Sequence, residues 1–308
     1  MQRFTDYRQM TGITGTAIAV GNFDGVHLGH RHLIELARTE GVRSNLIPGV
    51  LTFEPHPVRV LAPHVDLQLI CSVEERLQLL EDFGVELVLA QHFDRAFAAL
   101  DPVEFIEKVL VSALGVQHLI VGYDFGFGAR RSGNVELLKT HGRRLGFNVH
   151  VVSAVTDEAG LVASSSRIRT LLQSGDIATA NQVLGRAFCL SGVVVHGAQR
   201  GRELGFPTAN LKVSTEVRPR IGVYAGRLDW GAGPMDAVVN IGKNPTFGER
   251  QEQTVEAHVL GGGDYDLYGK ACRLTLIQRL RDERVFDGAE ALKSQIERDI
   301  ETALGYLG

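Results

Sequence analysis

The sequence predicts a chain of class α/β plus β: an α/β domain with a parallel sheet, then an antiparallel β-barrel with a C-terminal helix. Its length of 308 residues allows two hydrophobic cores. The first part alternates short apolar runs with longer periodic stretches, which is typical of parallel strands joined by crossover helices. After about Arg186, strand-like runs follow one another with Gly, Pro, Asn and Asp between them. That texture indicates an antiparallel barrel or sandwich.

The elements of the first domain are expected from short apolar runs and from helical periodicity. Strands are expected at 17–20, 47–53, 87–90, 119–121 and 149–152. Helices are expected between them at 30–38, 73–83, 102–113 and 135–141, and two further short helices at 166–173 and 177–184. We place the domain boundary after these helices, which gives domains of residues 1–185 and 186–308.

The second domain shows strand-like runs bounded by turn residues. They lie at 189–196, 222–228, 237–241, 255–260 and 271–277, and a helical pattern follows at 289–304. No low-complexity linker separates the two domains.

Composition excludes several classes of protein. Hydrophobic residues make up 44% and charged residues 22%, which is ordinary for soluble globular proteins, and no apolar run is long enough for a membrane span. The polar N-terminus is unlike a secretory signal, and three widely spaced cysteines favour a reducing, cytoplasmic location. The net charge of −4 argues against a nucleic-acid binder and favours a small phosphate-bearing ligand. Nothing in the sequence indicates an oligomeric state.

A first candidate site follows the opening strand, where the chain turns through Gly25 and Gly29 and begins a helix. The N–H groups and dipole of a helix N-terminus at the carboxyl edge of a parallel sheet favour phosphate. His27 and His30, three residues apart, can share one helical face and hold charge on a polyphosphate. The alternatives are two ordinary surface or core histidines, or a metal site that includes His32.

The segment 164–169, Ser-Ser-Ser-Arg-Ile-Arg, is a second phosphate-binding candidate. Ser164 and Ser165 precede an apolar helix, so their hydroxyls and the free N–H groups can accept phosphate oxygens. Arg167 and Arg169 can add bidentate charge. The alternative is a capped helix with surface arginines.

Asp124 follows an apolar strand and is therefore expected at the ligand edge of the sheet. The string Asp-Phe-Gly at 124–126 lacks the other motifs of protein kinases, and the nearby glycines do not complete a dinucleotide fingerprint. An Asx-turn is the alternative role for Asp124.

The second domain opens with a glycine-rich loop after its first strand. Gly197, Arg200 and Gly205 in this loop suit close backbone approach to phosphates, although many such loops are only turns. Thr208 and Asn210 follow, two residues apart, so in extended chain they point to the same side. Their hydroxyl and amide oxygens are hard ligands suited to Mg²⁺.

Glu256 alternates with Val255 and Ala257 in a strand-like run. It is therefore expected on the face opposite those apolar residues. A carboxylate there can act as a general base, and the alternative is a solvated glutamate on a half-exposed strand.

Together these segments resemble the bacterial bifunctional riboflavin kinase/FAD synthetases. The segments are 23–30 (FDGVHLGH), 52–57 (TFEPHP), 121–128 (VGYDFGFG), 164–169 (SSSRIR), 207–210 (PTAN), 222–225 (GVYA), 240–248 (NIGKNPTFG) and 254–260 (TVEAHVL). Each is weak alone, but their joint order over most of the chain is highly specific.

The resemblance implies a Rossmann-like nucleotidyltransferase domain and a flavokinase barrel that together convert riboflavin to FMN and FMN to FAD with ATP. In the first domain it implies that His27 and His30 bind the ATP phosphates, that the 164–169 segment closes over them, and that Asp124 helps place nucleotide or metal. It also implies flavin binding by Phe53, His56 and Pro57.

For the barrel, the resemblance implies Mg²⁺ on Thr208 and Asn210 and Glu256 as the base for the riboflavin hydroxyl. Three departures are present. Ser166 stands where threonine is usual, Arg31 where glutamine is usual, and three glycines at 261–263 where an acidic-aromatic turn is common.

Two rival functions remain at this point. One is an adenylyltransferase with an inert barrel, which the intact Thr208, Asn210 and Glu256 argue against. The other is a flavin-binding regulator, for which no helix-turn-helix pattern or basic face is present.

Overall fold

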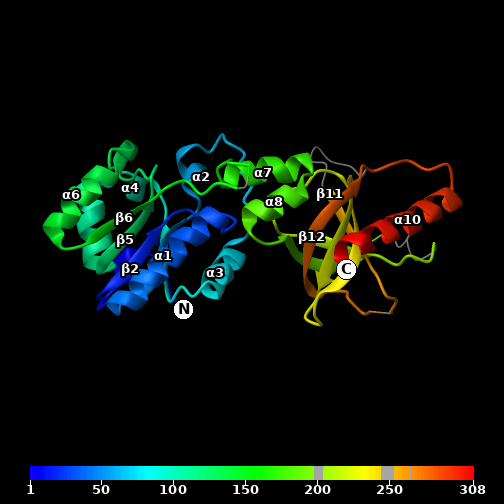
Figure 1. Cartoon of the computed structure of the whole chain (residues 1–308), viewed down its shortest axis with the longest axis horizontal. Coiled ribbons are helices and arrows are strands. Elements are labelled where there is room, and N and C mark those ends of the chain that lie inside the picture. Colours follow the sequence, from blue (N-terminus) through cyan, green and yellow to red (C-terminus); the bar gives the residue numbers. More distant parts are fainter. Residues whose placement is uncertain (158, 198–203, 244–252, 264) are drawn as a thin grey trace. The chain divides into compact units, whose positions relative to one another are not determined.

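The computed structural model describes residues 1–157, 159–197, 204–243, 253–263 and 265–308 (Figure 1). Packing divides them into two compact units, Met1–Leu67 with Val73–Ala163 and Gln68–Ser72 with Ser164–Gly308. The first unit contains a parallel sheet with helices, and the second a closed antiparallel barrel with a C-terminal helix. The predicted fold class is therefore confirmed.

The parallel sheet of the first unit has the strand order β1-β4-β3-β2-β5-β6. Its strands are β1 (Gln2–Phe4), β2 (Thr16–Val20), β3 (Ile47–Glu54), β4 (Leu87–His92), β5 (Val116–Gly122) and β6 (Asn148–Val152). The chain passes from β2 through β3 to β4 in one direction and then from β5 to β6 in the other. In open parallel sheets, ligands bind at the carboxyl ends of the strands beside such a reversal, here between β2 and β5.

Helices cover both faces of this sheet. They are α1 (Leu28–Ser44), α2 (Pro57–Leu61), α3 (Val73–Asp82), α4 (Arg95–Ala98), α5 (Pro102–Glu104) with its π-helical continuation (Phe105–Ala113), and α6 (Val135–Leu145). Alternate strand residues face opposite sides, so Ala19 and Ile120 pack in the core under α1, while Ile18 and Leu119 pack in the other core with Leu110. The sheet is thus buried on both sides, as parallel sheets require.

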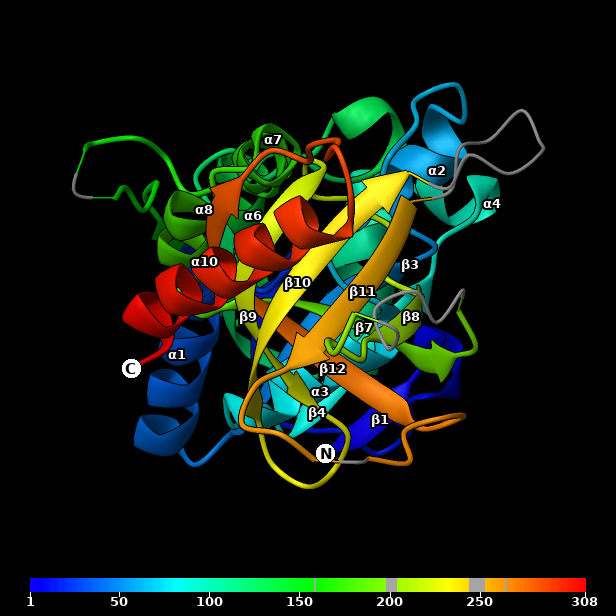
Figure 2. The ribbon, with the colours of Figure 1, turned by 90° about the vertical axis from the view of Figure 1, so that its right-hand side faces the viewer.

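The barrel of the second unit closes in the order β10-β11-β8-β7-β12-β9. Its strands are β7 (Phe188–Val195), β8 (Ala209–Val213), β9 (Gly222–Asp229), β10 (Met235–Lys243), β11 (Gln253–Val259) and β12 (Ala271–Arg281). Helix α10 (Ala289–Leu307) lies across β9 and β10 (Figure 2), where Ala303 and Leu307 are buried against Val223 and Val238. The sequence patterns did not indicate β1 or β8, which are short.

Helices α7 (Ser165–Ser174) and α8 (Ile177–Leu184) pack with the barrel unit. The Asn181 side chain donates to the Leu276 carbonyl (2.8 Å) and accepts from the Phe188 N–H (2.7 Å). The segment Gln68–Ser72 also joins this unit, where the Leu69 N–H donates to the Glu216 carboxylate (2.9 Å). The compact units therefore change at Ala163, whereas the boundary predicted at 185 follows the change in sequence texture.

Candidate active sites

The turn between β2 and α1 has an unusual backbone. Phe23 and Val26 have φ values of 52° and 38°, and Gly25 has 78°. The left-handed region is costly for a bulky or β-branched residue, and it persists only where the surroundings enforce it. Here both side chains are fully buried, and the Thr52 hydroxyl donates to the Asn22 carbonyl (3.1 Å). Strain of this kind is typical of functional sites.

The turn delivers His27 and His30 together to the N-terminus of α1. His27 occupies the N-cap position, and the two rings stack with centroids 3.7 Å apart and an interplanar angle of 22°. His27 is 6% exposed, and His30 is half-buried against Phe23 at 5.0 Å. A Cβ at Gly29 would lie 3.1 Å from the His27 ring, so glycine makes room for the pair. The predicted histidine pair thus sits where a helix end favours an anion.

Arg31, the departure beside this pair, points its guanidinium over the ring of Phe83, 4.6 Å from the centroid. Arginine stacks well on an aromatic face. The positive charge of Arg31 therefore lies over Phe83, directly after the end of α3.

Arg76 supports the same turn, and sequence reasoning missed it. It lies on α3, is 2% exposed, and makes an ion pair with Glu54 (2.7 Å) at the end of β3. Its Nη1 also donates to the Asn22 carbonyl (3.2 Å). The sequence did contain a signal for Arg76, because its helical spacing places it on the buried side of α3 with Leu79 and Leu80. A buried arginine needs partners and therefore indicates a structured polar site.

A pocket of about 840 Å³ opens at the carboxyl edge of the sheet. The strand reversal brings three predicted site residues to its wall: Phe53, Pro57 and Asp124. The wall also contains Gly21 and Asn22 of the turn and the aromatic residues Phe93, Phe97, Phe105, Phe125 and Phe127. Neighbouring rings contact one another, as Phe53 and Phe93 do at 5.6 Å. The pocket therefore combines several aromatic rings with charged groups, which include Arg95, Arg130 and Arg131.

Two predicted residues near this pocket, His56 and Asp124, differ in whether they line it. His56 does not line this pocket, because its Nδ1 accepts from the Val58 N–H (3.2 Å) and caps α2. Asp124 lines it with an exposed side chain, directly after β5, as the strand order predicts. The stacked histidines are also not among its lining residues.

Ser164 caps α7, as predicted, by accepting from the Arg167 N–H (3.3 Å). Ser165 begins the helix, and Arg169 Nε donates to the Gln68 carbonyl (2.8 Å). By packing, this segment belongs to the second unit and the histidine pair to the first. Its approach to the histidines stays a prediction.

In the barrel, Glu256 stands in register between two asparagines. It is paired with Asn210 of β8 on one side and with Asn240 of β10 on the other. Its neighbours Val255 and Ala257 are 3% and 0% exposed, while Glu256 is half-buried. Glu256 therefore faces away from them, as predicted. Directly opposed side chains lie within contact range, so the carboxylate has amide groups on both sides.

The position of Asn240 beside Glu256 was not foreseen, although Asn240 belongs to a segment that carries the family resemblance. A Cβ at Gly197 would overlap the Asn210 amide, so glycine lets the start of the loop lie against that side chain. Arg200 lies outside the described residues. Asn210 and Glu256 are thus adjacent in the barrel wall, with Gly197 against the Asn210 side chain.

Thr208 and Gly205 line a cavity of about 920 Å³. The His258 ring packs edge-on against Phe206 at 5.5 Å, and its Nδ1 is 2.8 Å from the Pro207 carbonyl oxygen. Further apolar and aromatic residues complete the wall: Leu260, Tyr265, Leu267, Tyr268, Ile300 and Leu304. The cavity reaches from the threonine to α10.

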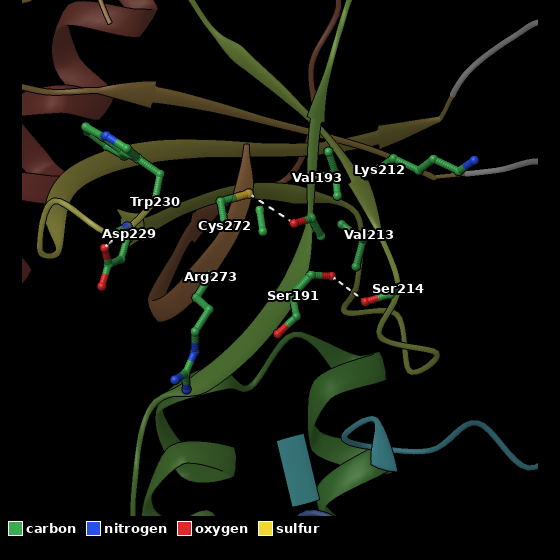
Figure 3. A pocket seen from close by; sticks show the side chains of 12 residues that line it. Ser191, Val193, Lys212, Val213, Ser214, Asp229, Trp230, Cys272 and Arg273 are labelled. Atoms are coloured by element: carbon green, nitrogen blue, oxygen red, sulfur yellow. Dashed lines mark hydrogen bonds between the residues drawn. The ribbon is translucent and has the colours of Figure 1, made fainter. Parts of the chain in front are cut away.

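A further cavity of about 740 Å³ lies along β7, β8, β9 and β12 (Figure 3). It contains none of the predicted site residues. Figure 3 shows Lys212 and Arg273 pointing in different directions, so their charges do not converge on one ligand atom. Burial, with a smaller contribution from Cys189, raises the pKa of the Cys272 thiol to about 11. An inert thiol and divergent cations do not form a catalytic centre.

The fold and its two candidate sites fit a two-unit enzyme, with a histidine pair at a helix N-terminus of an α/β unit and a glutamate between two asparagines in a barrel wall. The family described as FAD synthetase matches residues 10–166, and the family described as riboflavin kinase matches residues 184–307. The chain is 40% identical over 295 residues to the bifunctional riboflavin kinase/FMN adenylyltransferase of Escherichia coli (strain K12), covering 96% of this chain and 93% of that protein. It belongs to the bifunctional riboflavin kinase/FMN adenylyltransferase family.

The same family occurs in Bacillus subtilis (strain 168), whose protein is 35% identical over 296 residues, covering 94% of this chain and 92% of that one. A crystal structure described as a macrolide-efflux protein from Streptococcus pneumoniae has a TM-score of 0.90 and 30% identity, and covers 98% of this chain and 97% of that chain. The two chains share their fold over nearly their whole length. Among the helices that the structure describes here, none has both the length and the apolarity to cross a bilayer.

Proposed function

We infer that this chain transfers the γ-phosphate of ATP to riboflavin to form FMN, and then transfers AMP from a second ATP to FMN to form FAD and pyrophosphate. The observation that carries this conclusion is the match of two enzyme families to two separate stretches of one chain. Bifunctional relatives that align over more than nine-tenths of both proteins support the same pair of activities.

For riboflavin phosphorylation, Glu256 accepts the proton of the 5′-hydroxyl as that oxygen attacks the γ-phosphorus, and the bond between the γ-phosphorus and the bridging oxygen of ATP breaks to release ADP. Its half-buried position between Asn210 and Asn240 supports this role, because the flanking amides restrict the carboxylate. The oxygens of Thr208 and Asn210 fit Mg²⁺, which would neutralise charge on the ATP phosphates. The cavity beside Thr208 offers aromatic and aliphatic walls for the flavin ring.

For FMN adenylylation, the FMN phosphate attacks the α-phosphorus of ATP, and the bond to pyrophosphate breaks. His27 and His30 at the N-terminus of α1 stabilise the charge that develops on the phosphate oxygens. The aromatic pocket that contains Phe53 and Pro57 supports flavin binding at the neighbouring strand ends, with Asp124 at its wall. Ser164–Arg169 would close over the ATP phosphates.

The allocation of adenylyl transfer to residues 1–185 and of phosphorylation to 186–308 belongs to the same proposal. A cytoplasmic location also belongs to it. All three cysteines are described, and they are buried and form no disulfide, which suits a reducing compartment.

Two single variants test the separation of the activities. His30→Ala should lower FAD formation by about 10²–10³-fold and leave riboflavin phosphorylation within about twofold, because a charge-stabilising group is lost only at the first site. Glu256→Gln should lower FMN formation by about 10²–10⁴-fold, because the general base is lost. Time courses with riboflavin, ATP and Mg²⁺, separated by chromatography, measure both products.

The control supplies FMN directly to the Glu256→Gln protein, which should then form FAD at the wild-type rate. Loss of both activities in either folded variant would contradict two independent sites. Binding of riboflavin without any product from the wild-type chain would favour the flavin-binding regulator.

A further inference from the structure

Three side chains with metal-ligand chemistry meet on the α1 face of the parallel sheet. They are Glu40 near the end of α1, His118 on β5 and His150 on β6. In the register, His118 pairs with Ala17 near the start of β2, and His150 pairs with Ile120. His118 therefore lies near the amino end of its strand and His150 in the middle of its strand, whereas the histidine pair and the aromatic pocket lie at the carboxyl ends. Neither proposed activity uses it.

The ligand atoms of this cluster converge. His118 Nδ1 is 2.8 Å from His150 Nε2 and 3.4 Å from Glu40 Oε2, and all three atoms lie within 4.8 Å of one another. Zinc binds imidazole nitrogen and carboxylate oxygen at about 2.0–2.2 Å, which places neighbouring ligand atoms of one ion roughly 3–3.5 Å apart. Small side-chain adjustments are enough for one ion to contact all three.

The surroundings hold His118 in place. It is 7% exposed, so its ring nitrogens face protein groups rather than water. Its other nitrogen, Nε2, lies 3.5 Å from the Ser44 hydroxyl. Metal-bound histidines are usually oriented by such a partner on the second ring nitrogen.

One charge opposes a cation. Arg43 pairs with the same Glu40 oxygen at 2.6 Å, but its side chain is 67% exposed and can swing into solvent. An ion that binds here must displace this guanidinium. The strength of binding should therefore depend on Arg43 in a way that a simple hydrogen-bonded cluster would not show.

We propose that Glu40, His118 and His150 form a binding site for a borderline divalent metal ion such as Zn²⁺, distinct from both active sites. Two imidazoles and one carboxylate suit zinc or a neighbouring transition metal, whereas Mg²⁺ prefers oxygen ligands only. The bound ion joins the C-terminal part of α1 to β5 and β6. Because His27 caps α1 and His30 lies in its first turn, the ion stabilises the unit that holds them.

The test is calorimetric titration of the full chain with ZnCl₂, without nucleotide and with excess Mg²⁺ to occupy oxygen-rich sites. We expect one equivalent of Zn²⁺ whose affinity falls at least about 100-fold in His150→Gln, because loss of a ligand should cost at least as much as loss of an outer-shell partner. His150 is half-buried on an edge strand, so this variant should fold even if His118→Gln does not. Two control variants should still bind one equivalent of Zn²⁺. They are His64→Gln, at an exposed histidine, and His30→Gln, at the active-site pair.

Arg43→Ala should tighten Zn²⁺ binding by about fivefold or more, because a repelling and competing charge is removed. Zn²⁺ should also raise the melting temperature of the wild type but not of His150→Gln. The proposal is overturned if the wild type binds no Zn²⁺ at about 100 µM, the order of concentration used in such titrations. It is also overturned if His150→Gln still binds one equivalent of Zn²⁺ with wild-type affinity, or if His30→Gln no longer binds it.

Discussion

Replacing Arg76 by alanine should damage one activity and spare the other. Arg76 is 2% exposed, and its guanidinium contacts the Glu54 carboxylate (2.7 Å) and the Asn22 carbonyl (3.2 Å). Breaking a buried ion pair from one side costs about 3–5 kcal/mol. The Glu54 side chain is 31% exposed and can recover some hydration, which reduces the expected loss to about 2–3 kcal/mol.

That loss corresponds to a melting temperature lower by about 5–10 °C for a unit of this size. The Asn22 carbonyl keeps the Thr52 hydroxyl as a donor, so the turn that carries His27 should loosen rather than unfold. A displacement of about 1 Å at a catalytic group can cost on the order of 10²-fold in rate. We therefore expect FAD formation to fall by about 10–100-fold while riboflavin phosphorylation stays within about twofold.

The matched control is Arg38→Ala, because Arg38 makes an ion pair of the same 2.7 Å length with Glu35 on the exposed side of α1. Exposed ion pairs contribute little to the free energy of unfolding, so this variant should melt like the wild type and form both products at the wild-type rate. Scanning calorimetry and the two product assays measure the effects. An Arg76→Ala protein that melts and adenylylates like the wild type would refute the role given to this contact.

Three further changes test other parts of the structure. Gly197→Ala should lower riboflavin phosphorylation by about 10²-fold and spare FAD formation from supplied FMN, because the new Cβ displaces the Asn210 amide; an unchanged kinase rate would show that the amide position does not matter. Phe97→Ala should weaken FMN binding to the first unit, measured as a KM raised by about tenfold, because an aromatic wall of the pocket is lost; equal KM values would place the flavin elsewhere. Burial raises the pKa of Cys272 from 9.0 to about 11, so its stabilising contribution is complete below pH 9 and is lost between about pH 9 and 11. Urea unfolding at pH 8 and pH 10.5 should show a smaller pH-dependent loss for Cys272→Ala than for the wild type, and identical losses would exclude this thiol as the cause.

Local patterns were sufficient for much of the fold. The alternation of apolar runs with helical periods predicted five of the parallel strands and the longer helices between them, because periodicity reports which side of an element is buried. It did not indicate the short helices α2 and α4. The patterns missed β1, whose three residues are too few to show a period, and β8, which is one of the shorter strands of the barrel. The placement of α7 and α8 with the barrel was also invisible, since composition does not say which neighbour covers an apolar helix face.

The sequence by itself determined the chemistry of both candidate sites: a histidine pair at a helix start, a Thr-x-Asn string after a glycine-rich loop, and a glutamate opposite an apolar strand face. Only the tertiary structure decided which side chains meet across elements. It placed Asn240 beside Glu256, buried Arg76 against the turn of the histidine pair, and gathered Glu40 with two strand histidines. The physical reason is that spacing along one element is set by its own geometry, whereas contacts between elements depend on strand register and on packing against residues far away in the chain.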